Sequence, residues 1–140
     1  MRRFMAPFMK PDEFAARCEG YRYTVCSLYL DSPDLRLYRN TAEGNKNRFK
    51  LRMRRYNDGP GDPVYLEIKR RIDSVIYKQR CRVDEGLARA LLEGRVPCSP
   101  DESLDEVGRE FKRLAEGISA LPTIRVKYIR EAYESLAGDR

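Results

Sequence analysis

The segment Arg48–Arg54 alternates between basic and apolar side chains without interruption. Successive side chains of a β-strand point to opposite faces of a sheet, so this alternation predicts a strand with one basic and one apolar face. The basic positions are Arg48, Lys50, Arg52 and Arg54, and the apolar positions are Phe49, Leu51 and Met53. Neighbouring basic side chains on such a strand are about 7 Å apart. The chain must therefore fold with its core on one side of this strand and a dense positive surface on the other.

Two further strands are predicted after the turn-forming residues 57–63. The second strand begins at Val64 and the third covers Val75–Val83, and both again alternate. If the three strands pair, the basic side chains of all three share one face. The positions added by the second and third strands are Lys69, Arg71, Lys78, Arg80 and Arg82.

Glu67 is the only acidic residue among these face positions. Like charges at this spacing repel one another, more strongly as water is excluded, so a bound polyanion would stabilise the face. A solvated outer sheet face is the ordinary alternative for any single strand. Three successive strands of the same polarity favour the polyanion, because solvated faces usually include more acids.

The remaining pattern indicates an α+β fold. Ser99 and Glu102 have the spacing of a capping box, and the side chains after them recur at helical spacing. The helix that follows is expected to pack outside the sheet through Leu104, Val107, Phe111 and Leu114. The elements expected in addition are a strand over 21–31, a loop or hairpin turn over 40–47, helices over 84–93 and 100–116, and a strand from 123 to about 133.

Composition limits the class of protein. The chain has 140 residues and a formal net charge of +6, which fits a single domain over 1–140 with an anionic partner. No apolar stretch has the length of a spanning helix, so we expect a cytoplasmic protein. The sequence contains no histidine, which removes the usual general base and the Cys/His zinc sites. It also lacks the glycine-rich signatures of P-loop and Rossmann nucleotide sites.

Five segments, in this order, resemble the VTC domain, the polyphosphate polymerase domain of the CYTH or triphosphate tunnel metalloenzyme superfamily. They are YTVCSLYLDSPDLRLYRNTAEG, RFKLRMRRYN, PVYLEIKRR, KQR and PTIRVKYIREAY. The resemblance implies an antiparallel β-barrel that forms a basic tunnel, with two helices packed outside it. It also implies ATP and inorganic polyphosphate as ligands and a divalent metal, Mn²⁺ or Mg²⁺, as cofactor.

Carried over residue by residue, the resemblance assigns catalytic phosphate contacts to Arg52, Arg54, Lys69 and Arg130. Lys78 matches a further basic tunnel position. From the strand pattern, Arg48, Lys50 and Arg80 join Lys78 as substrate-binding candidates. Glu67 is a candidate metal ligand, and its alternative role is a salt bridge across the strands.

The resemblance further suggests that the chain begins after the first strand of the family domain and ends before its last strands. We therefore expect the chain to bind polyphosphate with little or no polymerisation. Two alternatives stay open at this point. One is a non-catalytic β module that binds RNA or another polyanion. The other is a triphosphate hydrolase of the same superfamily, in which water attacks instead of phosphate.

Overall fold

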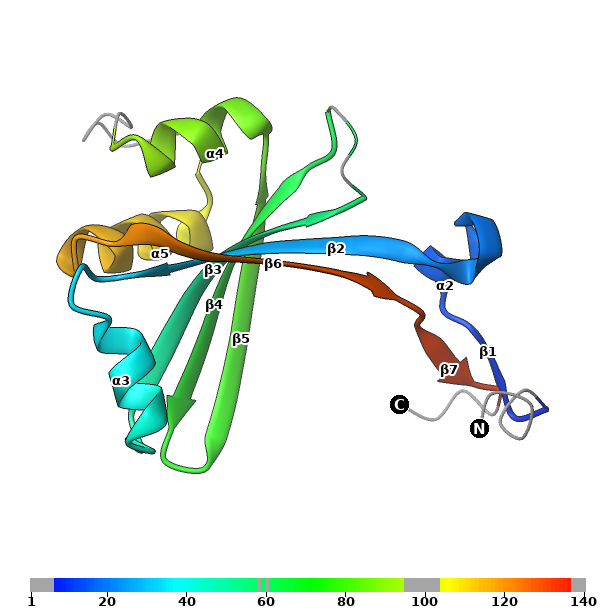
Figure 1. The fold of residues 1–140 in the computed structure, drawn as a ribbon, viewed down its shortest axis with the longest axis horizontal. Helices are drawn as coiled ribbons and strands as arrows, with labels where there is room; N and C mark the ends of the chain where they lie inside the picture. Colours follow the sequence, from blue (N-terminus) through cyan, green and yellow to red (C-terminus); the bar gives the residue numbers. More distant parts are fainter. Residues whose placement is uncertain (1–6, 58, 60, 95–103, 137–140) are drawn as a thin grey trace.

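A computed structural model describes residues 7–57, 59, 61–94 and 104–136 of the chain. It confirms an α+β fold with antiparallel sheets (Figure 1). The strands are β1 (Met9–Pro11), β2 (Tyr23–Asp31), β3 (Arg48–Tyr56), β4 (Val64–Ile72), β5 (Val75–Val83), β6 (Leu121–Arg130) and β7 (Tyr133–Ser135). The helices are α2 (Glu13–Ala16), a 3₁₀ turn over Glu19–Tyr21, α3 (Arg36–Ala42), α4 (Glu85–Leu92) and α5 (Glu106–Gly117).

The large sheet has the strand order β5-β4-β3-β2-β6, and every neighbouring pair is antiparallel. The three strands predicted from the alternating pattern are adjacent in it, in the expected order. Within the described part of the chain, β5 and β6 are the outer strands of this sheet. The α+β architecture is thus confirmed, while closure of the sheet into a tunnel stays a prediction.

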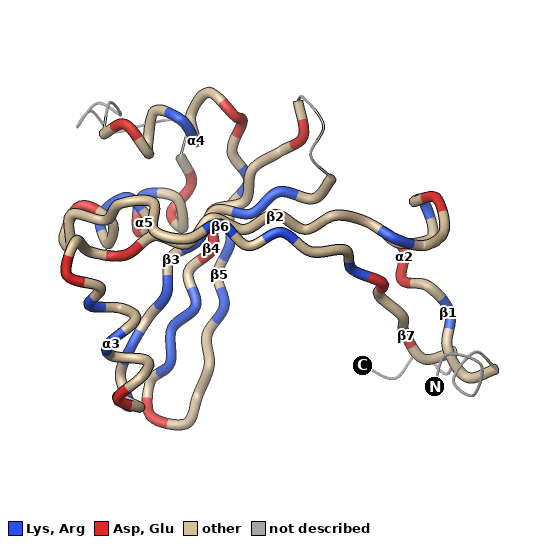
Figure 2. The backbone as a smooth tube through the Cα atoms, viewed as in Figure 1, with Lys and Arg blue, Asp and Glu red and all other residues tan. Residues whose placement is uncertain are grey.

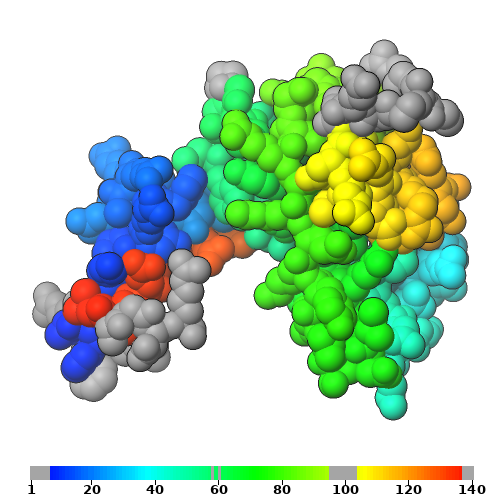
Figure 3. Space-filling view, turned by 180° about the vertical axis from the view of Figure 1, so that it is seen from behind, coloured from blue at the N-terminus to red at the C-terminus, as the bar shows by residue number. Residues whose placement is uncertain are grey.

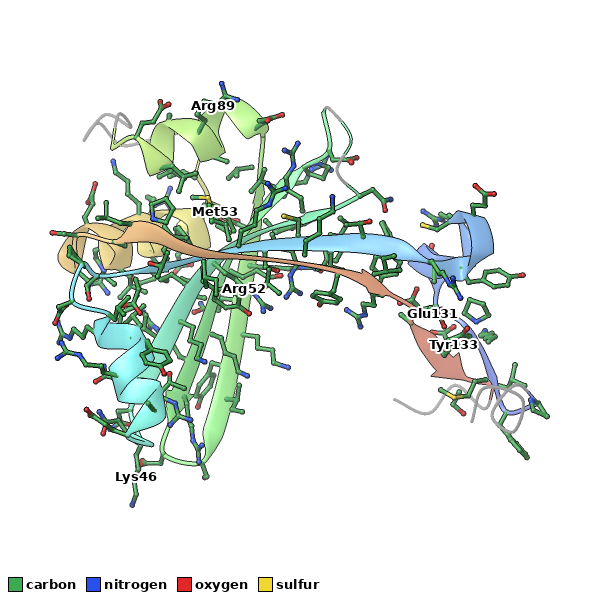
Figure 4. The ribbon with its side chains drawn as sticks, viewed as in Figure 1. Lys46, Arg52, Met53, Arg89, Glu131 and Tyr133 are labelled. Carbon is green, nitrogen blue, oxygen red and sulfur yellow. The ribbon has the colours of Figure 1, made fainter. Side chains whose placement is uncertain are left out.

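Helices α4 and α5 cover the apolar face of this sheet. Phe111 of α5 is 1% exposed, and Leu104 just before the helix is 2% exposed. Both belong to one cluster with Leu51 and Leu66 of the sheet, and Val107 and Leu114 pack against it. The expected packing of this helix is therefore confirmed. Figure 4 shows the consequence in β3, where the neighbours Arg52 and Met53 lie on opposite sides of the sheet.

A smaller part of the molecule forms where β2 and β6 extend beyond the other strands. Here β1 pairs with β7, and α2 packs through Ala15 against Tyr23 and Val25 of β2. Figure 3 shows this part, in blue and red, set apart from the main body with an open notch between them. The strand expected over 21–31 begins at Tyr23, because Glu19–Tyr21 form the 3₁₀ turn.

Three further sequence expectations need correction. Residues 40–47 are not entirely a loop, because α3 extends to Ala42. The helix expected from residue 100 begins at Glu106, since the Asp105 carboxylate accepts a hydrogen bond from the Gly108 amide and caps it there. The Ser99 and Glu102 capping box lies outside the described residues.

The last strand also differs from the expected range. It begins at Leu121 instead of 123, with Pro122 inside an outer strand, where a missing N–H costs least. It ends at Arg130, and β7 then pairs with β1 in a separate two-stranded sheet. None of the described helices is long and apolar enough to cross a membrane.

Candidate phosphate-binding face

The strand register brings the predicted basic side chains to one face of the sheet, opposite α4 and α5. Figure 2 shows the blue stretches of β3, β4 and β5 running side by side. Directly paired residues form rows across the strands, and these rows are Tyr29–Arg52–Glu67–Arg80, Ser27–Arg54–Tyr65–Arg82, Lys50–Lys69–Lys78 and Arg48–Arg71. We call this surface the basic face.

Three lysines lie opposite one another in a single row of the basic face. Lys50 pairs with Lys69 and Lys69 pairs with Lys78, so the three, here called the lysine row, follow the hydrogen-bonding direction of the sheet. Adjacent strands are about 4.8 Å apart, so the backbone positions of these lysines are closer together than those of neighbouring basic residues along one strand. The described residues supply no carboxylate within ion-pair distance of these side chains. Like charges directly opposite each other destabilise a sheet, so this row favours a bound anion.

Arg52 and Arg54 make a different kind of contact, because their side chains are held by neighbours on the same face. Arg52 Nε donates to Glu67 Oε2 at 2.5 Å, and its Nη1 donates to the Tyr29 hydroxyl at 3.2 Å. Arg54 Nε donates to Ser27 Oγ at 3.1 Å, and its Nη1 lies 3.9 Å from Glu67 Oε1. Both guanidinium groups are thus fixed in position before any ligand arrives.

The Arg52 side chain stays protonated in this environment. Burial by itself would lower the pKa of Arg52, but the hydrogen bonds to Tyr29 and Glu67 and the Glu67 charge outweigh it. The pKa is therefore raised above its ordinary value. Arg52 remains a permanent cation at the centre of the basic face.

Glu67 is occupied by these arginines. Its side chain is only 12% exposed, and each of its carboxylate oxygens lies against one of the two guanidinium groups. The described residues also contain no group of three or more His, Cys, Asp or Glu side chains able to hold a metal ion. Hard divalent cations need several oxygen ligands, so this donor set does not fit a metal held by protein carboxylates. The geometry supports the salt-bridge role of Glu67.

The other predicted residues lie on the same face but not at one point. Arg80 extends from β5 with its Cζ 5.1 Å from the centroid of the Tyr65 ring. Arg48, the first residue of β3, donates to the backbone carbonyl of Asn45 just before the strand. Arg130 stacks over Tyr23, which precedes Tyr29 by six residues in β2, so it lies about 20 Å along the strand from the Arg52 row. The structure thus brings together Arg52, Arg54 and the lysine row, and leaves Arg130 apart.

Sequence reasoning missed the roles of Ser27 and Tyr29. Both occupy the basic face of β2, where they accept hydrogen bonds from Arg54 and Arg52. Their position was visible in the alternation of β2, but the pairing of β2 with β3 was not. Register decides these contacts, and an isolated strand pattern does not contain it.

Comparison with known families gives one match, in which the family model described as the VTC domain matches residues 1–140. The comparison with curated proteins gave no match.

Proposed function

The chain belongs to the VTC domain family, a family of CYTH-like polyphosphate polymerase domains, and we propose that its basic face binds the phosphate chains of ATP and inorganic polyphosphate. The basic face would then form part of the wall of a tunnel, with α4 and α5 outside. The proposal rests on the agreement between the family and the charge arrangement of the sheet.

The lysine row is the observation that carries this proposal. Three cations without carboxylate partners among the described residues lie in a line across three strands. A linear chain of phosphates offers negative charge at short, regular intervals along a line. A ligand lying across the strands would meet each lysine in turn, and its charge would relieve the repulsion among them.

Arg52 and Arg54 are suited to bind the phosphoryl group that is transferred, where negative charge is redistributed during the reaction. A guanidinium group has several donors in a fixed plane and binds two phosphate oxygens at once. Phosphoryl transfer requires mainly alignment and neutralisation of charge on the transferring group. The reaction we propose is attack by a terminal phosphate oxygen of polyphosphate on the γ-phosphorus of ATP. A new P–O bond forms, the bond to the bridging oxygen breaks, and ADP leaves with that oxygen.

Competition between two polyanions tests the binding proposal. The protein is loaded with a fluorescent linear polyphosphate and titrated with unlabelled polyphosphate or single-stranded RNA at equal phosphate concentration and ionic strength. We expect polyphosphate to displace the probe at lower concentration. If RNA displaces the probe equally well, a nucleic-acid-binding module would be favoured, because the bases of RNA would then not weaken its binding to the basic face.

Product analysis with ATP and manganese tests the reaction. Polyphosphate growth with release of ADP supports transfer to phosphate, and release of inorganic phosphate alone supports the hydrolase. Binding without either product would contradict the proposed reaction and leave the binding proposal in place.

A further inference from the structure

A pocket of about 400 Å³ adjoins one end of the lysine row. It lies between α3 with the residues that precede it, on one side, and β2, β3 and β6 on the other. The lining residues on which the argument depends are Tyr29, Leu35, Tyr38, Lys50, Ile124 and Val126. Most of this lining is apolar, with Lys50 as its basic residue and Asp31 as its acidic residue. The apolar lining of the pocket contrasts with the charged rows of the basic face beside it.

Asp31 holds α3 in the position that forms the pocket. Its carboxylate is buried and accepts hydrogen bonds from the backbone amides of Ser32, Leu37 and Tyr38, at 2.8, 2.8 and 2.9 Å. Because Asp31 is the last residue of β2, these bonds tie the start of α3 to the end of the strand. The pocket wall is therefore part of the folded framework.

Leu35 occupies a backbone conformation that leucine seldom adopts. Its φ angle is 58°, in the left-handed region that favours glycine, and its side chain is 42% exposed. An exposed leucine in this conformation costs free energy and does not contribute to the core. Its side chain does contribute an apolar wall to the pocket.

We propose that this pocket binds the base of a nucleoside triphosphate whose phosphate chain lies along the lysine row. Lys50 belongs to both the pocket and the row, so a ligand that fills both needs a planar apolar part joined to a phosphate chain. Tyr29 makes the same connection, since its ring lines the pocket and its hydroxyl accepts a hydrogen bond from Arg52. Polyphosphate alone would leave the apolar walls exposed to water. The inference rests on the proposed function and adds the site that distinguishes ATP from a bare phosphate chain.

Binding of ATP and of tripolyphosphate, measured by calorimetry on the same variants, tests this assignment. Leu35→Gly removes an apolar wall while relieving the backbone, so its folding stability should be equal to or above that of the unchanged protein. Val126→Trp fills the pocket from β6. Ile129→Trp is the matched control, because Ile129 lies on the opposite face of the same strand and is 71% exposed.

We expect Val126→Trp to weaken ATP binding about tenfold and Leu35→Gly to weaken it severalfold, a range set by the usual effect of losing base contacts. Tripolyphosphate affinity should stay within about twofold in both variants, and Ile129→Trp should change neither ligand. Equal losses of affinity for the two ligands, or unchanged ATP binding in both variants, would overturn the base pocket. Phosphate binding by the basic face would not be affected by that result. If tripolyphosphate does not bind, while the pocket variants still weaken ATP binding, phosphate binding by the basic face would be overturned and the base pocket would be supported. Failure of both ligands to bind would overturn both.

Discussion

Arg52 and Glu67 face each other across β3 and β4, with Arg52 Nε 2.5 Å from Glu67 Oε2. The same carboxylate lies 3.9 Å from Arg54, so one acid holds two arginines at the centre of a basic face. Under the proposed function, Glu67 is an internal anion with which a phosphate chain would have to compete. Its role can be separated from that of a metal ligand by experiment.

Glu67→Gln should raise polyphosphate affinity severalfold, because two guanidinium groups lose their carboxylate partner and become available to phosphate. The same change should lower the free energy of unfolding by about 1–3 kcal/mol, since charged hydrogen bonds on a partly buried face are lost. Calorimetric titration with and without a chelator measures the first effect, and urea unfolding the second. Weaker binding, seen only when divalent metal is present, would identify Glu67 as a metal ligand instead.

Asp31→Ala should destabilise the protein by about 1–3 kcal/mol, because three backbone N–H groups lose their acceptor at a buried site. Asp31→Asn keeps one acceptor oxygen and should cost less. Urea unfolding of the two variants gives the comparison. Equal stability of Asp31→Ala and the unchanged protein would mean that α3 is held mainly by Leu37 in the core.

The Glu110 carboxylate links α5 to the sheet and should contribute to acid sensitivity. It accepts hydrogen bonds from Arg113 on its own helix and from Arg70 on β4, and these lower its pKa to about 2. Since the pKa is lower in the folded state than in the unfolded chain, this stabilisation is present above the unfolded value near 4.5 and is lost as pH falls toward 2.

Glu110→Gln should therefore reduce stability at neutral pH and flatten the dependence of stability on pH between about 5 and 2. Unfolding curves collected across that range test it, with Glu116→Gln on the same helix as the control, since the Glu116 side chain is 63% exposed. Parallel pH profiles for the Glu110 variant and the unchanged protein would exclude this linkage.

The alternation of Arg48–Arg54 was sufficient to predict the basic face, because side-chain direction in a strand follows directly from sequence parity. Lys69, Lys78 and Arg80 were placed correctly on that face for the same reason. The α3 helix was missed, since it is short, its N-cap position is Leu35, which offers no side-chain acceptor, and its first amides instead donate to the carboxylate of Asp31 at the end of β2. Arg130 was grouped with the arginines of β3, but only the register of β6 on β2 reveals how far along the sheet it lies.

The pairing of Glu67 with two arginines likewise required the register of β4 on β3. The sequence pattern left its metal and salt-bridge roles open, and the structure favours the second. The pocket beside Lys50 had no sequence signal, because β6, which supplies one of its walls, is far along the chain from β2, α3 and β3, and α3 was not predicted.

The most direct test of phosphate binding by the basic face compares the polyphosphate affinity of two double variants. One carries Lys69→Ala and Lys78→Ala, and the other carries Arg89→Ala and Arg113→Ala. Both double variants lose two positive charges, but Arg89 and Arg113 lie on the helix side of the sheet with side chains 69% and 70% exposed. We predict that the lysine-row variant binds about tenfold to a hundredfold more weakly and shows a smaller salt dependence, by about one unit of slope for each lysine. The helix-side variant should stay within about threefold of the unchanged protein. Equal losses in the two variants would show that net charge alone attracts the ligand and would contradict a binding site on the basic face.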